Sequence, residues 1–586
     1  MRFLANVLAT VIGLFIFCML FFFGILILGA LFGGSSDVAT VKTNSVLEFD
    51  LDNVSRDYAG KYKDPLVTMF DGGEAVGVSD ILNAIKAAKT DDNIKGISIL
   101  NNSVSTGMAQ TKEIRDQLED FKKSGKFIVA YANSYSQKDY YLDSVADTVF
   151  MNPVGLMDFK GLSTEVLFFK DFQEKSGLKM EVVRHGKYKS AVEPFLENSM
   201  SEANREQVTA LLKSVWNSIA ADIAKSRKVS VEQINIVADG LLARTPEMAK
   251  AQKLIDKIAY EDEYHNGIRR VLKVDKDDEY NKIDLLDYAQ NIAMSPANIG
   301  AANEIAVIYA QGTILSGEGD VSYIGEESMR RSLQEARKDK KVKAIVIRID
   351  SPGGSALTSD LIWREIELTK KVKPIVVSMG NVAASGGYYI ACNANRIFAE
   401  QSTITGSIGV FGTLPNFTGL TNRMGIHAEQ VKTHQNAADY SVFSPLDETF
   451  RDVVQQSIEE IYNTFVTRVA TGRKMTFAQV DALAQGRVWS GSEALANGLV
   501  DEIGGLQNAI KAAAKLAKTD DYRIQNYPEY EKDFSELFAN FPLAKTRESF
   551  IKEEIGAENY RMIEQIRRLN QHKGVQALLP FELNIH

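Results

Sequence analysis

The chain has 586 residues, of which 45% are hydrophobic and 24% charged, an ordinary balance for a globular protein of roughly three to four domains. Its net charge of -9, without a block of Lys and Arg, argues against nucleic-acid binding. Because there are only two cysteines, Cys18 and Cys392, and no CxxC or HExxH pattern, we expect no disulfide framework, no metal site and no cofactor.

The first 36 residues predict a membrane anchor. No charged residue lies between Arg2 and Asp37, and Val11 to Phe32 are dominated by Leu, Ile, Phe and Val. About 20 such residues span a bilayer, whereas a cleavable signal peptide has an apolar core of only about 7 to 15 residues. We therefore expect residues 1–36 to form an uncleaved transmembrane helix. The small residues Gly33 to Ser36 leave a cleaved precursor as the alternative.

The charges beside this segment predict its orientation. Arg2 precedes the apolar run and Asp37 follows it. By the positive-inside tendency, the amino terminus then lies in the cytoplasm. The rest of the chain would lie across the membrane, which predicts a single-pass inner-membrane protein with a periplasmic body in a Gram-negative cell.

Beyond the anchor, the same order of elements occurs twice. The predicted strands and helices of the two copies are, pairwise, 45–51 and 304–310, 79–89 and 327–338, 94–100 and 342–349, and 127–130 and 374–378. Strands that alternate with helices of about 10 to 15 residues predict βαβ units with parallel sheets. The expected fold class is therefore α/β.

The two copies also align in sequence. Lys95 to Ile99 matches Lys343 to Ile347, and Tyr140 to Leu142 matches Tyr388 to Ile390 at the same offset. We interpret the chain as a diverged duplication. The predicted domains are an anchor, an N-terminal repeat, a C-terminal repeat and a mixed helical tail, at 1–36, 37–295, 296–519 and 520–586.

Each copy keeps polar residues that the other lacks. The second contains Asp350-Ser-Pro-Gly-Gly-Ser355 and a later Ser385 in Ala-Ser-Gly-Gly, where the first copy has Gln137. Conversely, the first copy has Lys189 in Gly-Lys-Tyr-Lys-Ser, opposite Ala437 or one of its neighbours. A serine in a glycine-rich setting and a lysine from the other copy could together form one Ser/Lys site.

Ser385 stands where a strand passes into a helix. Free backbone N–H groups and the positive end of the helix dipole lie there, a suitable place to stabilise an oxyanion. Gly386 permits close backbone approach, and Gly353 and Gly354 at the end of the preceding strand could offer a second N–H. The alternative is that Ser385 only caps a helix. The presence of both motifs in one copy and the loss of both in the other favours the catalytic interpretation.

A serine nucleophile needs a base. None of the six histidines stands in a recognisable triad, although spacing does not exclude His427 or His434. A lysine serves if burial removes its charge, and Lys189 is followed by small and apolar residues. The alternative is a solvated surface lysine. Lys187, two positions earlier, would share a face with Lys189 in a regular strand, so the residues alone do not choose between them.

Four motifs together resemble one family. They are Gly186-Lys-Tyr-Lys-Ser-Ala-Val-Glu-Pro-Phe195, Asp350-Ser-Pro-Gly-Gly354, Ala384-Ser-Gly-Gly-Tyr-Tyr389 and Thr405-Gly-Ser-Ile-Gly-Val410. In this order they resemble signal peptide peptidase A of the long, duplicated bacterial type. The resemblance covers nearly the whole chain, including the anchor.

The resemblance implies a fold, a site and a reaction. The fold would be two tandem repeats of the Clp-type protease/crotonase superfamily. Ser385 would be the nucleophile, Lys189 the general base, Ser407 a hydroxyl that holds the lysine amine, and Gly354 and Gly386 the oxyanion donors. The substrates would be remnant signal peptides at the membrane, cleaved through an acyl-enzyme by a homotetramer.

Two other functions remain open at this point. A crotonase-type acyl-CoA enzyme would use similar glycine N–H groups but needs neither the Ser/Lys pair nor an anchor. A catalytically inactive membrane scaffold would use the duplication only for assembly.

Overall fold

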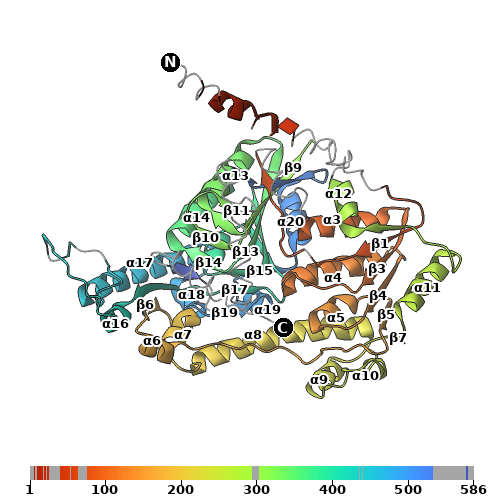
Figure 1. Ribbon diagram of the computed structural model, residues 1–586, viewed down its shortest axis with the longest axis horizontal. Helices are drawn as coiled ribbons and strands as arrows, with labels where there is room; N and C mark the ends of the chain where they lie inside the picture. Colours follow the sequence, from red (N-terminus) through yellow and green to blue (C-terminus); the bar gives the residue numbers. More distant parts are fainter. Residues whose placement is uncertain are drawn as a thin grey trace.

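The computed structural model describes residues 6, 10–17, 19–21, 23–24, 40–52, 54–63, 76–293, 302–434, 436–437, 440–531 and 576–578. Two largely parallel sheets lie beside each other, with helices packed against them, in a mixed α/β fold (Figure 1). The predicted anchor lies partly outside the described residues. No helix among the residues searched is both long and apolar enough to cross a membrane.

The first sheet has the strand order β7-β5-β4-β3-β1-β8, and all its neighbouring strands are parallel. Its strands are β1 (Ser45–Phe49), β3 (Ile94–Leu100), β4 (Phe127–Ala132), β5 (Thr148–Met151), β7 (Lys257–Ile258) and β8 (Lys282–Asp284). Helices α3 (Val78–Thr90), α4 (Met108–Lys122) and α12 (Leu285–Ala293) cover one face, and α11 (Glu261–Leu272) covers the other. Because both faces are covered, the central strands are almost continuously apolar.

The second sheet repeats this order as β20-β16-β15-β13-β9-β21, with β17 and β19 added beside β15. Its strands are β9 (Glu304–Gln311), β13 (Val342–Ser351), β15 (Ile375–Ala384), β16 (Arg396–Ala399), β17 (Ile404–Gly406), β19 (Val488–Ser490), β20 (Glu502–Ile503) and β21 (Arg523–Tyr527). Helices α13 (Glu326–Lys338), α14 (Ala356–Lys370) and α15 (Gly386–Ala391) pack on one face and α20 (Leu506–Ala517) on the other. The alternation of strands and helices predicted for both copies is confirmed.

A third sheet joins the two halves of the chain. Its order is β11-β12-β10-β14-β23-β18-β6. The strands are β6 (Lys179–His185), β10 (Thr313–Leu315), β11 (Gly319–Asp320), β12 (Tyr323–Gly325), β14 (Gly353–Ser355), β18 (Val410–Asn416) and β23 (Gln576–Leu578). Among the described strands of this sheet, only β6 comes from the first half, and it pairs along its whole length with β18.

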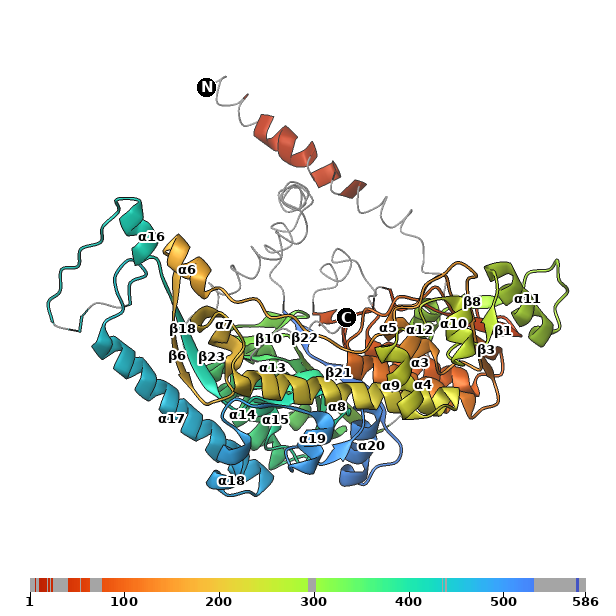
Figure 2. The same cartoon turned by 90° about the horizontal axis from the view of Figure 1, so that it is seen from below.

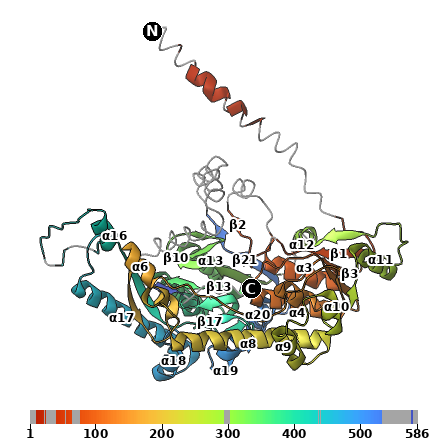
Figure 3. The same ribbon diagram turned by 60° about the horizontal axis from the view of Figure 1, so that its bottom comes forward.

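Further helices extend around these sheets. Helix α8 (Glu202–Arg227) runs along both halves, and α17 (Glu448–Arg473) packs against β6 and β18 (Figures 2 and 3). The shorter elements are β2 (Lys61–Tyr62), α5 (Gln137–Asp143), α6 (Lys170–Ser176), η1 (Ser190–Val192), α7 (Glu193–Leu196), α9 (Val231–Asp239), α10 (Pro246–Ala251), α16 (Thr418–Arg423), α18 (Phe477–Leu483), α19 (Gly491–Ala496) and β22 (Glu529–Tyr530).

Most of the predicted mixed helical tail, residues 520–586, lies outside the described residues. Its described residues form strands: β21 pairs with β9 at the edge of the second sheet, and β22 pairs with β2. The pattern Arg523-Ile-Gln-Asn-Tyr527 is mixed and only half buried, as suits an edge strand, and such a pattern gives little periodic signal in sequence.

Candidate active site

Strand pairing between the two halves brings Lys189 to the second sheet. Strand β6 runs antiparallel to β18, with His185 opposite Val410 at its end. The chain then leaves the strand in a turn, in which Lys187 is exposed and Lys189 is fully buried. Because the segment is irregular, the two lysines do not share a face.

Three side chains meet at the end of this turn. Lys189 Nζ lies 3.0 Å from Ser385 Oγ and 3.0 Å from Ser407 Oγ, in hydrogen-bond geometry. The same amine also donates to the Ser407 carbonyl oxygen at 3.3 Å. The lysine and the two serines belong to one chain, and all three are 0% exposed.

The surroundings of Lys189 disfavour its charge. Burial lowers the pKa of the Lys189 amine well below its ordinary value. Among the described residues no carboxylate forms an ion pair with the Lys189 amine, whose pKa shift is caused by burial, and the Phe411 ring centre lies 5.7 Å from Nζ. An amine in this setting can remain neutral and accept a proton.

Ser385 occupies a strained turn between β15 and α15. Its backbone angles are φ 54 and ψ -114, a region that residues other than glycine rarely adopt. Ser385 N donates to Gly406 O at 2.8 Å, and Oγ approaches Gly409 O at 3.4 Å. A sharp strand-to-helix turn of this kind places a serine hydroxyl at the end of a strand, and here it directs the buried Ser385 hydroxyl toward Lys189.

The two predicted oxyanion donors lie on either side of this turn. Gly386 is the first residue of α15, where a backbone N–H has no partner inside the helix. Gly354 lies in β14, against which α15 packs, and an added Cβ would lie 2.1 Å from Ile314 O. The neighbouring Gly353 donates its N–H to Ser351 Oγ at 3.1 Å.

The matching position in the first half has a structural function. Gln137 begins α5, as Ser385 precedes α15. Its Oε1 accepts from the backbone of Lys160 and Gly161 at 3.0 and 2.9 Å, and its Nε2 donates to Gly161 O at 3.0 Å. The glutamine therefore ties down a loop where the second half carries a serine.

Neither candidate histidine contacts the serine. His427 and His434 are exposed, and the side-chain hydrogen bonds of Ser385 within the described part of the chain involve Lys189 and Gly409. No cluster of described His, Cys, Asp or Glu side chains could hold a metal ion.

Some residues of the site escaped sequence reasoning. An added Cβ at Gly409 would lie 3.2 Å from Lys189 Cδ, and one at Gly486 would lie 2.7 Å from Lys189 Cα. Both glycines therefore make room for the lysine. Gly409 belongs to a motif already noted, whereas nothing in the sequence around Gly486 marks it.

One described strand fills a gap beside this site. Strand β23 pairs antiparallel with β14, where Ala577 faces Gly354, and with β18, where Gln576 faces Phe411. Strands β14 and β18 are therefore separated by the width of one strand. This slot is bordered by Gly354 on one side and by the strand following Gly409 on the other.

Comparisons with known proteins agree with one family. The family model described as Peptidase family S49 matches residues 120–275 and 367–520. Protease 4 of Haemophilus influenzae is 35% identical over 512 residues, which cover 84% of this chain and 83% of that protein. Protease 4 of Salmonella typhi is 38% identical over 458 residues, covering 76% and 73%.

A plant relative is also similar. The chloroplastic serine protease SPPA of Arabidopsis thaliana is 35% identical over 467 residues, which cover 78% of this chain and 68% of that protein. The two matched regions lie one in each half of the chain, as the repeated sheets do. This chain belongs to peptidase family S49.

Proposed function

We propose that this protein is a serine peptidase in which Ser385 is the nucleophile and Lys189 the general base. The observation that carries the proposal is the 3.0 Å contact between Lys189 Nζ and Ser385 Oγ, with a lysine that is fully buried and lacks a described carboxylate partner. A lysine activates a serine only as the free amine, and burial favours that form. Ser407 orients the Lys189 amine toward Ser385 Oγ, because its hydroxyl and its carbonyl oxygen both contact Nζ.

The reaction is peptide hydrolysis through an acyl-enzyme. Neutral Lys189 takes the proton from Ser385 Oγ while this oxygen bonds to the carbonyl carbon. The N–H groups of Gly354 and Gly386 bind the resulting oxyanion, each worth about 10² to 10³ in rate. The intermediate collapses as the C–N bond breaks, and the lysine ammonium gives its proton to the leaving amine. Water then repeats these steps on the ester and releases Ser385.

The slot between β14 and β18 suits an extended peptide. A peptide strand there would pair its main chain with both neighbours, as in recognition by strand addition. The chain's own strand β23 lies in this slot and pairs with Gly354 and Phe411, which supports this mode of binding. Because main-chain pairing depends little on sequence, hydrophobic or unfolded peptides, including cleaved signal peptides, are the substrates we infer.

We further propose that residues 1–36 anchor the enzyme in the bacterial inner membrane, with the catalytic part in the periplasm. The described apolar side chains of this segment are exposed, among them Val11 at 59% and Phe15 at 70%. Such a surface fits lipid better than water. The Clp/crotonase fold type and the homotetramer belong to the same proposal.

The decisive experiment removes each member of the pair. Ser385→Ala and Lys189→Ala should each abolish hydrolysis of a peptide ester, and the double variant should be no worse, because residues that act as one unit are not additive. Lys187→Ala is the matched control and should retain activity, since Lys187 is exposed. A fluorophosphonate should label the wild type at Ser385.

Other outcomes would point to other functions. An acyl-CoA enzyme would turn over thioesters without labelling at Ser385, and an inactive scaffold would be neither labelled nor active. If His427→Gln or His434→Gln, in a folded protein, lost about 10³ or more in kcat/KM, that histidine would be the base in place of lysine.

A further inference from the structure

Strand β15, which leads to Ser385, does not pair regularly with β13. The register between the two strands shifts between Ile349 and Ser351, so that one residue of β13, Asp350, faces residues 380–382 of β15. Such a bulge bends a strand and changes the direction of the side chains that follow, and bulges are common beside active sites. The bulge therefore determines how β15 presents Ser385.

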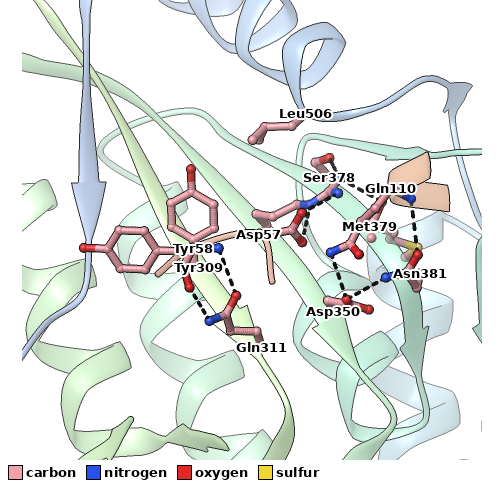
Figure 4. Close-up of polar contacts among 12 residues, drawn as sticks. Asp57, Tyr58, Gln110, Tyr309, Gln311, Asp350, Ser378, Met379, Asn381 and Leu506 are labelled. Carbon is pink, nitrogen blue, oxygen red and sulfur yellow. Dashed lines mark hydrogen bonds and ion pairs between the residues drawn. The ribbon is translucent and has the colours of Figure 1, made fainter. Parts of the chain in front are cut away.

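The carboxylate of Asp350 supplies hydrogen-bond acceptors at this bulge. Oδ1 accepts from Val382 N at 2.9 Å. Oδ2 accepts from Asn381 Nδ2 at 3.0 Å (Figure 4). Glycine at position 380 lets the Asp350 and Asp57 side chains lie close to the β15 backbone, because a Cβ added to Gly380 would lie 3.0 Å from Asp350 Cβ and 3.2 Å from Asp57 Oδ2. One side chain thus replaces the strand partner that the bulge lacks.

A side chain from the first half of the chain also contacts this carboxylate. Gln110 of α4 donates from Nε2 to Asp350 Oδ2 at 3.4 Å. Its backbone N donates to Asn381 Oδ1 at 3.2 Å (Figure 4). Asn381 is therefore held from both sides, and its amide orientation is fixed by the two contacts.

A buried arginine balances the carboxylates near the bulge. Arg348, 1% exposed, contacts Asp57 at 2.9 and 3.0 Å and Glu113 at 2.7 Å. Its Nη1 donates to Ser378 Oγ at 2.8 Å and to Met379 O at 3.2 Å, where β15 enters the bulge. Asp57 and Glu113 belong to the first half, so the network links the bulge to the half that supplies the lysine.

Asp350 contacts or adjoins both chain segments that form the proposed site: the turn that leads to Gly354 and the strand segment that leads to Ser385. The next residue, Ser351, begins the turn to Gly354, and Ser351 Oγ accepts from the Gly353 backbone at 3.1 Å. On the other strand, Val382 is followed by Ala-Ala-Ser385. A movement of the carboxylate would therefore shift the nucleophile relative to the oxyanion turn.

We propose that Asp350 is a positioning residue of the peptidase site, whose carboxylate holds the β15 bulge in the shape that presents Ser385 to Lys189 and to the Gly354 turn. The inference rests on the proposed peptidase function. Asp350 acts through the backbone and Asn381 and makes no contact with reacting atoms.

The test compares Asp350 with a matched aspartate in the full-length protein. Asp501 also accepts from a strand N–H, that of Ile397 at 2.8 Å, and pairs with Arg473 at 2.7 Å, but it lies beside β16 and away from the bulge. Asp350→Ala should lose about 10² in kcat with KM changed by less than about threefold, as expected when a reacting group is displaced by about an ångström. Asp501→Ala should leave kcat of the folded fraction unchanged.

Exchanging the hydrogen-bond donor and acceptor between Asp350 and Asn381 tests whether their contact restores kcat. Asp350→Asn keeps an oxygen for Val382 and should lose less than about tenfold, whereas Asn381→Asp sets two carboxylates against each other and should lose as much as Asp350→Ala. The double variant Asp350→Asn/Asn381→Asp restores the side-chain pair in reverse and should return to within about tenfold of wild type. These variants decide the question even if Asp350→Ala does not fold.

Two kinds of failure are distinguishable. Folded Asp350→Ala with kcat within about threefold of wild type, an equal loss in Asp501→Ala, or no recovery in the double variant would overturn the positioning role of Asp350. Full activity of Ser385→Ala would refute the peptidase function itself.

Discussion

Burial favours the neutral amine that our proposal requires of Lys189, and it also makes this lysine costly to the fold. The fully buried amine has lost its hydration, and the pKa of Lys189 falls well below its ordinary value for that reason. Ser385 adds strain, because a non-glycine residue at φ 54 costs on the order of 1 to 3 kcal/mol. Both residues trade stability for chemistry, as is common at functional sites.

Replacing the lysine should therefore stabilise the protein while abolishing activity. In the wild type, the unfolded state binds a proton at about pH 10.5 that the folded lysine does not bind until lower pH. Between these two values, wild-type stability falls as pH falls, by up to about 1.4 kcal/mol per pH unit. Lys189→Met cannot bind this proton and so lacks this loss of stability at lower pH. The variant's free energy of unfolding should exceed that of the wild type most near neutral pH, and the difference should vanish toward pH 10.5.

Calorimetric unfolding of both proteins from pH 7 to about pH 10.5 checks this expectation, since other titrating groups cancel in the difference. Parallel stability curves would mean that Lys189 is charged in the folded protein. The same free amine predicts that kcat/KM rises with pH through the depressed pKa of Lys189 and then remains constant.

At the scale of elements, two strands decide how the site is formed. Strand β6 crosses from the first half to pair with β18, and this pairing delivers Lys189 to the second sheet. Strand β23 fills the slot between β14 and β18. The chain thus contributes both a residue of the site and a strand that occupies the proposed peptide position.

Weakening β23 should make the slot more accessible to peptides. Proline at position 577, which faces Gly354, removes an N–H and disfavours strand pairing. If β23 occupies the slot nine-tenths of the time, Ala577→Pro should lower the apparent KM for a peptide ester about tenfold, because occupancy by the chain itself reduces apparent affinity. Ala577→Val keeps the N–H and is the control.

Steady-state kinetics of the two variants and of the wild type test whether β23 competes with substrate for the slot. Equal KM values for Ala577→Pro, Ala577→Val and wild type would mean that β23 does not compete with substrate.

At the scale of the whole molecule, neither half contains all the residues of the proposed site. The first half supplies Lys189 and the second supplies Ser385 and Ser407, with contacts of 3.0 Å between them. Interactions along the boundary, such as Arg348 with Asp57 and Glu113, hold the halves together. Divergence after duplication therefore left each copy dependent on the other.

Removing the proposed anchor should leave this body intact. A variant lacking residues 1–36 should be soluble without detergent and should hydrolyse a small peptide ester with kcat within about twofold of wild type. The proposed catalytic residues Lys189, Ser385 and Ser407 all lie outside this segment, and none of its described residues contacts them. Gel filtration and steady-state kinetics measure both properties. Aggregation of the shortened variant at every tested boundary would indicate a further membrane-facing surface.

The sequence by itself determined the repeated α/β order, because strands and helices buried in a core carry periodic apolar patterns that are local in the chain. The predicted strand Ile94–Leu100 is found with the same bounds. The sequence also predicted Ser385, Lys189 and Ser407 as site residues. The two copies carry different residues at the positions of Ser385 and Lys189, and the family resemblance covers all three. An irregular edge strand such as Arg523–Tyr527 lacks such a pattern and was not predicted.

Only the tertiary structure decided which side chains meet. Lys189 and Ser385 are 196 positions apart, and their contact depends on the pairing of β6 with β18. Whether Lys189 or Lys187 is buried depends on a turn that no local pattern marks. The bulge held by Asp350 likewise arises from the relative register of two strands. Contacts of this kind are set by packing between distant segments, which a single sequence does not encode as a local signal.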